Sequence, residues 1–106
     1  MRTVHMVICI LALSVGMVMA AYLPSLERGK ELFNSTMLGT NGKSCASCHS
    51  HGKMLKNTGT FDDAKLELII NQCIHASLDG SPLPSGSPDM ASLVMYLRSL
   101  VIAAAH

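Results

Sequence analysis

The sequence is short of aromatic and charged residues. It contains no tryptophan, two tyrosines and two phenylalanines, and 14% of its 106 residues are charged. So few aromatic side chains fill little of a core, and domains of this size often need a covalent cross-link or a bound metal for stability. We therefore expect a thin core that side chains alone do not complete.

The first twenty residues have the pattern of a secretory signal peptide. Arg2 supplies the positive start, an apolar run extends from Val7 to Val18, and small residues surround a cleavage site after Ala20. The alternative is a retained membrane anchor, for which the apolar stretch is near the lower length limit. We expect cleavage, which leaves residues 21–106 as one periplasmic or otherwise exported domain without stable membrane insertion.

Residues 21–106 have neither an excess of charge nor a strand pattern. Without Arg2 the chain keeps seven of its eight Lys and Arg against seven Asp and Glu, a balance that argues against nucleic acid as a partner. No segment alternates apolar and polar residues with the period of a strand, so we expect an all-α fold. No nucleophile stands beside a base, which favours a carrier over an enzyme.

Capping residues and apolar periodicity predict three helices, over about 25–33, 62–78 and 88–102. Each one follows a residue that can cap a helix start, and a proline occupies the first position of the last. The capping residues are Ser25, Thr60 or Asp62, and Ser87, and the proline is Pro88. The residues expected to face the core are Leu26, Gly29, Leu32 and Phe33, then Leu66, Ile69, Ile70 and Cys73, then Met90, Leu93, Val94, Leu97 and Val101.

The most specific feature is the pentapeptide CASCH at 45–49. In the pattern C-x-x-C-H, two thiols form thioethers with the vinyl groups of a haem and the following imidazole binds its iron. Two alternatives are a dithiol redox pair and a zinc site completed by His51. The dithiol pair belongs beside a βαβ unit, which the predicted elements lack. We therefore expect one covalent haem c, held by Cys45 and Cys48, with His49 as a metal ligand.

Counting the cysteines leaves one thiol unassigned. Cys9 falls inside the predicted signal peptide, and the haem motif uses two more of the four cysteines. The remaining one is Cys73. An odd thiol in an exported protein is buried, paired between chains or used chemically, so Cys73 is a candidate for a role of its own.

Three features occur in order along residues 21–106: a glycine and an aromatic residue on the first helix, the haem motif, and an aromatic residue between leucines on the last helix. The residues are Gly29, Phe33, Cys45–His49, Leu93, Tyr96 and Leu97. In these features the domain resembles a class I cytochrome c. The resemblance implies about three main helices around one covalent haem, with the terminal helices crossing where Gly29 meets Tyr96. It also implies an electron carrier that cycles between Fe(II) and Fe(III) and serves redox partner proteins.

One part of the chain departs from that family. The family's usual sixth iron ligand is a methionine in a Met-Pro loop before the last helix, where this sequence has Leu83. Segments 70–73, 80–84 and 87–90 are instead similar to a subset of sulfur-oxidation cytochromes and thiosulfate dehydrogenases. In that subset the cysteine that matches Cys73 binds haem iron, so the resemblance implies the same role here.

Four side chains are candidates for the sixth position on the iron. Cys73 and Met90 lie on predicted inner faces, although both residue types also serve as plain core residues. His75 points about 200° around its helix from Cys73, and Met54 lies in a short loop close to the motif. An open position is the remaining alternative.

The identity of this ligand separates three functions. A stably filled position suits an electron carrier, which is the main hypothesis. A reactive Cys73 suits the haem subunit of an enzyme that oxidises sulfur compounds. An open or weakly filled position suits a gas-binding haem protein.

Overall fold

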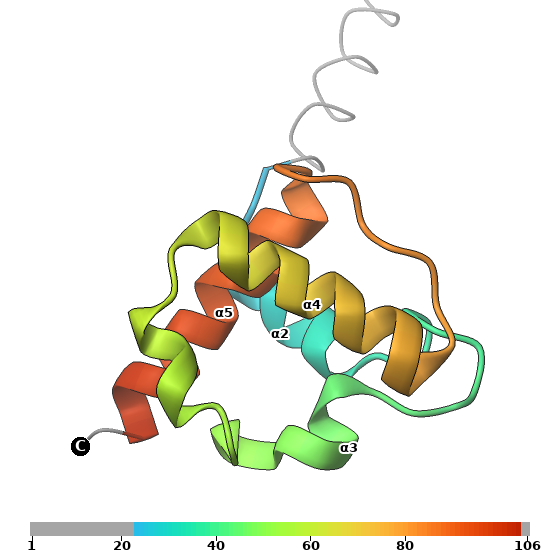
Figure 1. Ribbon diagram of the computed structural model, residues 1–106, viewed down its shortest axis with the longest axis horizontal. Coiled ribbons are helices and arrows are strands. Elements are labelled where there is room, and N and C mark those ends of the chain that lie inside the picture. Colours follow the sequence, from blue (N-terminus) through green and yellow to red (C-terminus); the bar gives the residue numbers. More distant parts are fainter. Residues whose placement is uncertain (1–22, 105–106) are drawn as a thin grey trace, which may run out of the picture.

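The computed structural model describes residues 23–104, and every regular element in this span is helical (Figure 1). The predicted signal peptide, residues 1–20, lies outside the described residues. The elements in chain order are α2 Leu26–Asn34, α3 Cys45–His49, the 3₁₀ segments η1 Ser50–Gly52 and η2 Lys56–Thr60, α4 Asp63–Leu78 and α5 Pro88–Ala104. The predicted all-α class is therefore confirmed. Within 23–104 no helix is long and apolar enough to cross a bilayer.

The three long helices begin where the sequence predicts, because a side chain caps each start. Each capping oxygen accepts an N–H that the first helical turn leaves without a partner. The bonds run from Arg28 N–H to Ser25 at 3.0 Å, from Lys65 N–H to Asp62 at 2.8 Å and from Met90 N–H to Ser87 at 3.2 Å. Helix α3 was not predicted, because five residues are too few to show an apolar period.

Helices α2 and α5 cross in direct backbone contact. A Cβ atom on Gly29 would overlap the carbonyl oxygen of Ser92 and lie 2.6 Å from the Cβ of Tyr96. Only glycine permits this approach. The rings of Phe33 and Tyr96 pack nearby, with centroids 5.3 Å apart. The Ser25 N–H also donates to the buried Ser92 hydroxyl at 3.0 Å, which holds the start of α2 on α5.

Helix α4 contacts α5 and passes in front of α2 and α5 in the view of Figure 1, but its buried stripe differs from the predicted one. Ile69 is half-buried and Cys73 is exposed, so the prediction that they face the core was wrong. The buried residues are Leu66, Ile70, Ile74 and Leu78. Residues four apart lie nearly in line along a helix, so the buried residues form one stripe. Ile69 and Cys73 each precede a residue of that stripe by one position, so they lie about 100° around the helix axis from it. They form a neighbouring face of α4.

The predicted core faces of the other two long helices agree more closely with the structure. Most of the expected residues are buried: Gly29, Leu32, Phe33, Met90, Leu93, Val94 and Leu97. Two were wrong, since Leu26 is 50% exposed and Val101 is only half-buried. Both lie near the outer ends of their helices, where fewer neighbouring elements cover a side chain.

Replacing Gly29 by alanine is expected to lower the free energy of unfolding by about 1–3 kcal/mol. The added Cβ would meet the Ser92 backbone, which cannot turn aside as a flexible side chain can. Chemical denaturation measures the change. Lys30→Ala, at an exposed position one residue further along α2, is the control and should stay within about 0.5 kcal/mol of the parent. Equal stability of the two variants would contradict the close crossing.

Candidate functional site

The loop before α3 is fastened to the C-terminal end of α4. The N–H of Thr40 donates to the Leu78 carbonyl at 2.9 Å, and its hydroxyl donates to the Asp79 carbonyl at 2.8 Å. The side-chain amide of Asn41 donates to the Ser77 carbonyl at 2.8 Å. Carbonyls at a helix end otherwise lack partners. The loop therefore caps α4 and at the same time fixes where α3 begins.

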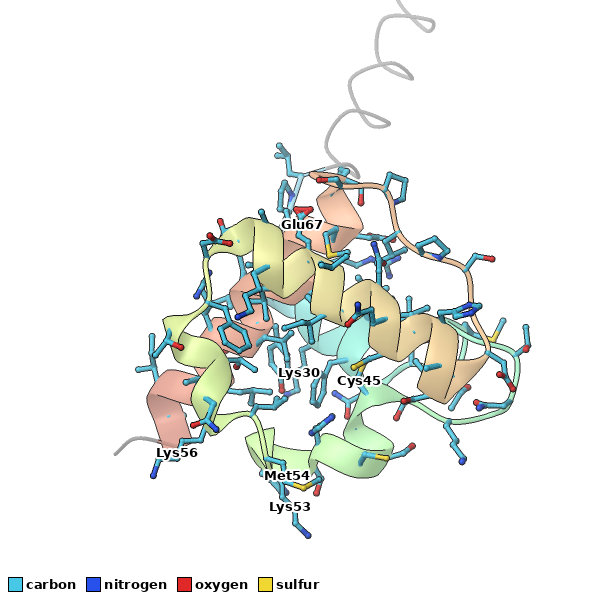
Figure 2. The ribbon with its side chains drawn as sticks, viewed as in Figure 1. Lys30, Cys45, Lys53, Met54, Lys56 and Glu67 are labelled. Carbon is cyan, nitrogen blue, oxygen red and sulfur yellow. The ribbon has the colours of Figure 1, made fainter. Side chains whose placement is uncertain are left out.

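Helix α3 carries both motif cysteines on one side. The N–H of buried Ser44 donates to the Ser47 hydroxyl at 2.9 Å, which shapes the first turn. Residues three apart are neighbours on a helix surface, and Cys45 and Cys48 both line a cavity beside α4. Figure 2 shows Cys45 pointing from α3 toward α4. The two thiols thus face the same space, as attachment to one porphyrin edge requires.

His49 is held in one tautomer. Its Nδ1 lies 2.8 Å from the carbonyl oxygen of Lys53. Because a carbonyl only accepts hydrogen bonds, Nδ1 carries the proton and Nε2 of the neutral ring keeps its lone pair. Metal-binding histidines commonly orient the ring through such a second hydrogen bond. Nε2 of His49 is therefore the ring nitrogen with a lone pair available for a metal ion.

A strained turn supplies that carbonyl. His51, Gly52 and Met54 have φ angles of 55°, 78° and 66°, a region that is costly for residues other than glycine. Gly52 lies against α5, where an added Cβ would be 3.3 Å from the Cβ of Leu100. The turn therefore folds the chain back toward His49 and rests on α5.

Two adjoining cavities lie where α3 faces α4. The larger one holds about 470 Å³ of space not filled by protein atoms, part of it open to solvent. Its apolar lining comes from α2, α4, α5 and the loop after α3. These side chains are Phe33, Leu55, Leu66, Ile69, Ile70, Leu93 and Leu97. Cys45, His49 and Cys73 line both the larger and the smaller cavity. The donor atoms are thus placed at the edge of an apolar space, as a bound haem requires.

Cys73 is the one α4 residue that lines both cavities. Partial removal from water raises the pKa of its thiol, and the nearby Cys48 raises it further. Partial burial also raises the pKa of the Cys45 thiol, with a smaller contribution from Cys73. Cys73 is therefore close enough to both motif thiols to interact with them electrostatically, and the raised pKa values of Cys45 and Cys73 favour the protonated form of these two thiols. A metal ion reverses that preference, since a coordinating thiol loses its proton.

The other candidate ligands lie away from these cavities. Met90 is 0% exposed within the core and lines neither cavity. His75 is exposed, about 200° around α4 from Cys73. Met54 is 72% exposed, and Figure 2 shows it on the surface beside Lys53. Of the four candidates, Cys73 alone lines these two cavities together with the motif histidine.

The donor set fits a haem better than a bare metal ion. In the described part of the chain, no three His, Cys, Asp or Glu side chains are grouped as a bound metal ion needs, which disfavours the zinc alternative with His51. A haem iron takes four ligands from its porphyrin and at most two from the protein. The His49 imidazole and the Cys73 thiol can serve as these two ligands, and Cys45 and Cys48 can attach the porphyrin.

Sequence reasoning missed one functional group, the backbone carbonyl of Lys53. Any residue carries a carbonyl, so no side-chain pattern marks it. The available signal was Gly52, whose conformational freedom permits the turn.

No family model matches the chain, and no solved structure matches it. The chain is similar to the L-cysteine S-thiosulfotransferase subunit SoxA of Pseudaminobacter salicylatoxidans, with 33% identity over 84 residues. The match covers 70% of this chain and 29% of SoxA, so the chain spans less than a third of that relative's length. The resemblance to sulfur-oxidation cytochromes seen in the sequence is thereby supported.

Gly52→Ala is expected to weaken the His49–Lys53 hydrogen bond, because the new Cβ strains a positive φ and crowds Leu100. Gly42→Ala is a matched control, since Gly42 has a φ of 79° but nothing within 4 Å of an added Cβ. Both variants should lose about 1 kcal/mol of stability from the backbone alone. Only Gly52→Ala should speed the solvent exchange of the His49 ring N–H, measured by NMR. Equal exchange in both variants would contradict the role assigned to the turn.

Proposed function

We propose that this chain is a haem c protein that transfers single electrons during the oxidation of sulfur compounds. The observation that carries the proposal is the apolar cavity lined by Cys45, His49 and Cys73. The similarity to SoxA supports a haem-type redox role of this kind. The proposed electron partners are other redox proteins.

Each part of the site has a distinct task in this proposal. Bound haem supplies an iron that changes between Fe(II) and Fe(III). Cys45 and Cys48 hold the ring covalently, and His49 binds the iron through Nε2. The Lys53 carbonyl keeps the imidazole oriented. The apolar walls of the cavity exclude water, which limits the reorganisation of solvent when the charge on the iron changes.

Export is part of the proposal. Haem c is attached outside the cytoplasm, and residues 1–20 have the pattern of a cleaved leader. The mature domain then begins near Ala21 and carries a single haem.

A second function is favoured by the position of Cys73. If the Cys73 thiolate were a ligand of the bound iron, the chain would serve as a haem subunit of a sulfur-compound-oxidising enzyme, with Cys73 as its reactive ligand. Cys73 lines both cavities beside the motif, which supports ligation in either function. A negatively charged thiolate stabilises Fe(III), so it lowers the reduction potential relative to a methionine ligand.

The purified exported protein is expected to carry one covalent haem. Mass spectrometry should give the mass of the mature chain plus one haem, and acid–acetone should not extract it. Cys45→Ala combined with Cys48→Ala should abolish both the haem and the folded protein. Cys73→Ala is the control and should retain the covalent haem. A stable haem-free domain that holds zinc would refute the proposal.

The sixth ligand is tested by two substitutions. Cys73→Ser should change the ferric absorption spectrum and raise the reduction potential, because the thiolate charge is lost. Met90→Leu should leave both unchanged, since Met90 lies in the core and lines neither cavity.

Other outcomes identify the alternatives. Loss of the long-wavelength band of methionine ligation in Met90→Leu would make Met90 the ligand. An unchanged spectrum in both variants would exclude both residues. Carbon monoxide binding to the parent without ligand displacement would favour the gas-binding function.

A further inference from the structure

The loop that connects α4 to α5, residues 79–87, is fastened along α4; we call it the return loop. The side-chain amide of Asn71 donates to the Leu83 carbonyl at 2.9 Å, and its oxygen accepts the Leu83 N–H at 2.8 Å. The carboxylate of Glu67 accepts the Gly86 N–H at 3.0 Å and the hydroxyl of the preceding serine at 2.9 Å. The return loop therefore runs back along the helix it has just left, as Figure 1 shows.

The return loop and the cavity lie on different sides of α4. Two residues along a helix turn about 200° around its axis, so Asn71 and Cys73 point in nearly opposite directions. Cys73 lines the cavities, whereas Leu83 lines neither of them and packs against the core cluster. Helix α4 thus stands between the return loop and the space beside His49.

We infer that Asn71 is a positioning residue that, together with Glu67, keeps the return loop on the side of α4 away from the cavities beside His49. The candidate ligand that lines these cavities together with His49 then comes from α4 itself, and it is Cys73. This inference rests on the proposed function, because it concerns access to a bound haem.

The two hydrogen bonds of Asn71 go to the backbone of Leu83 and not to its side chain. Any residue other than proline at position 83 is held in the same place. The lack of a methionine ligand in the return loop is therefore due to the position of the backbone as well as to the leucine side chain. Placing a methionine at position 83 should not by itself produce methionine ligation.

The experiment uses the full haem-loaded protein and removes the competing thiol. In the double variant Cys73→Ser, Leu83→Met, the ferric spectrum should lack the methionine–iron band, and the ferrous protein should bind carbon monoxide. Adding Asn71→Ala and Glu67→Ala releases the return loop, so the band should appear and carbon monoxide affinity should fall. A methionine band in the double variant, or its absence after release, would overturn the inference.

Asn34→Ala, added to the double variant, is the matched control. Within residues 23–104 the Asn34 side chain bonds only to the Lys30 carbonyl on its own helix, at 2.9 Å, so this substitution should leave the spectrum of the double variant unchanged. A methionine band in this control would mean that general loosening moves the return loop, and it would overturn the role of Asn71.

Amide hydrogen exchange keeps the inference testable if the released variant does not fold. Asn71→Ala in the parent background should speed exchange of the Leu83 amide about tenfold or more, because its acceptor is lost. Unchanged exchange would overturn the role of Asn71. Absence of covalent haem from the parent protein would overturn the proposed function and this inference together, whereas a methionine band in a haem-loaded double variant overturns the inference alone.

Discussion

The backbone contact between α2 and α5 is the constraint on which the rest of the structure depends. With no side chain at Gly29, the two helices approach closely enough for Phe33 to reach Tyr96. The same crossing brings Phe33 from α2 and Leu93 and Leu97 from α5 to one cavity wall. A chain with four aromatic residues has little else with which to build that wall. The candidate site therefore depends on a contact outside it.

Helix α4 links the core, the site and the return loop through three faces. Its buried stripe joins the core and contacts α5, its Cys73 face borders the cavity, and its Asn71 face holds the return loop. Each residue turns a helix by about 100°. A rotation of α4 by that angle would therefore turn its present core face, cavity face and loop face toward different neighbours. The hydrogen bonds from the Thr40 N–H and the Asn41 side chain to its last two carbonyls resist such a rotation.

Local features of the fold were predictable because their signals lie within a few residues. Ser25, Asp62 and Ser87 each cap the helix that follows, as their position before an apolar stretch predicts. The face of Cys73 was not predictable in the same way. The stripe through Ile69 and the stripe through Ile74 are both apolar, and only packing against α5 selects between them.

The sequence by itself determined the all-α class, the helix starts and the spacing of Cys45, Cys48 and His49, since caps and motif spacing act over one or two helical turns. Only the tertiary structure decided which groups surround that motif. The carbonyl that orients His49, the approach of Cys73 and the exclusion of the return loop all depend on how helices far apart in the sequence pack. Burial of apolar surface sets that packing, and it is a property of the assembled chain.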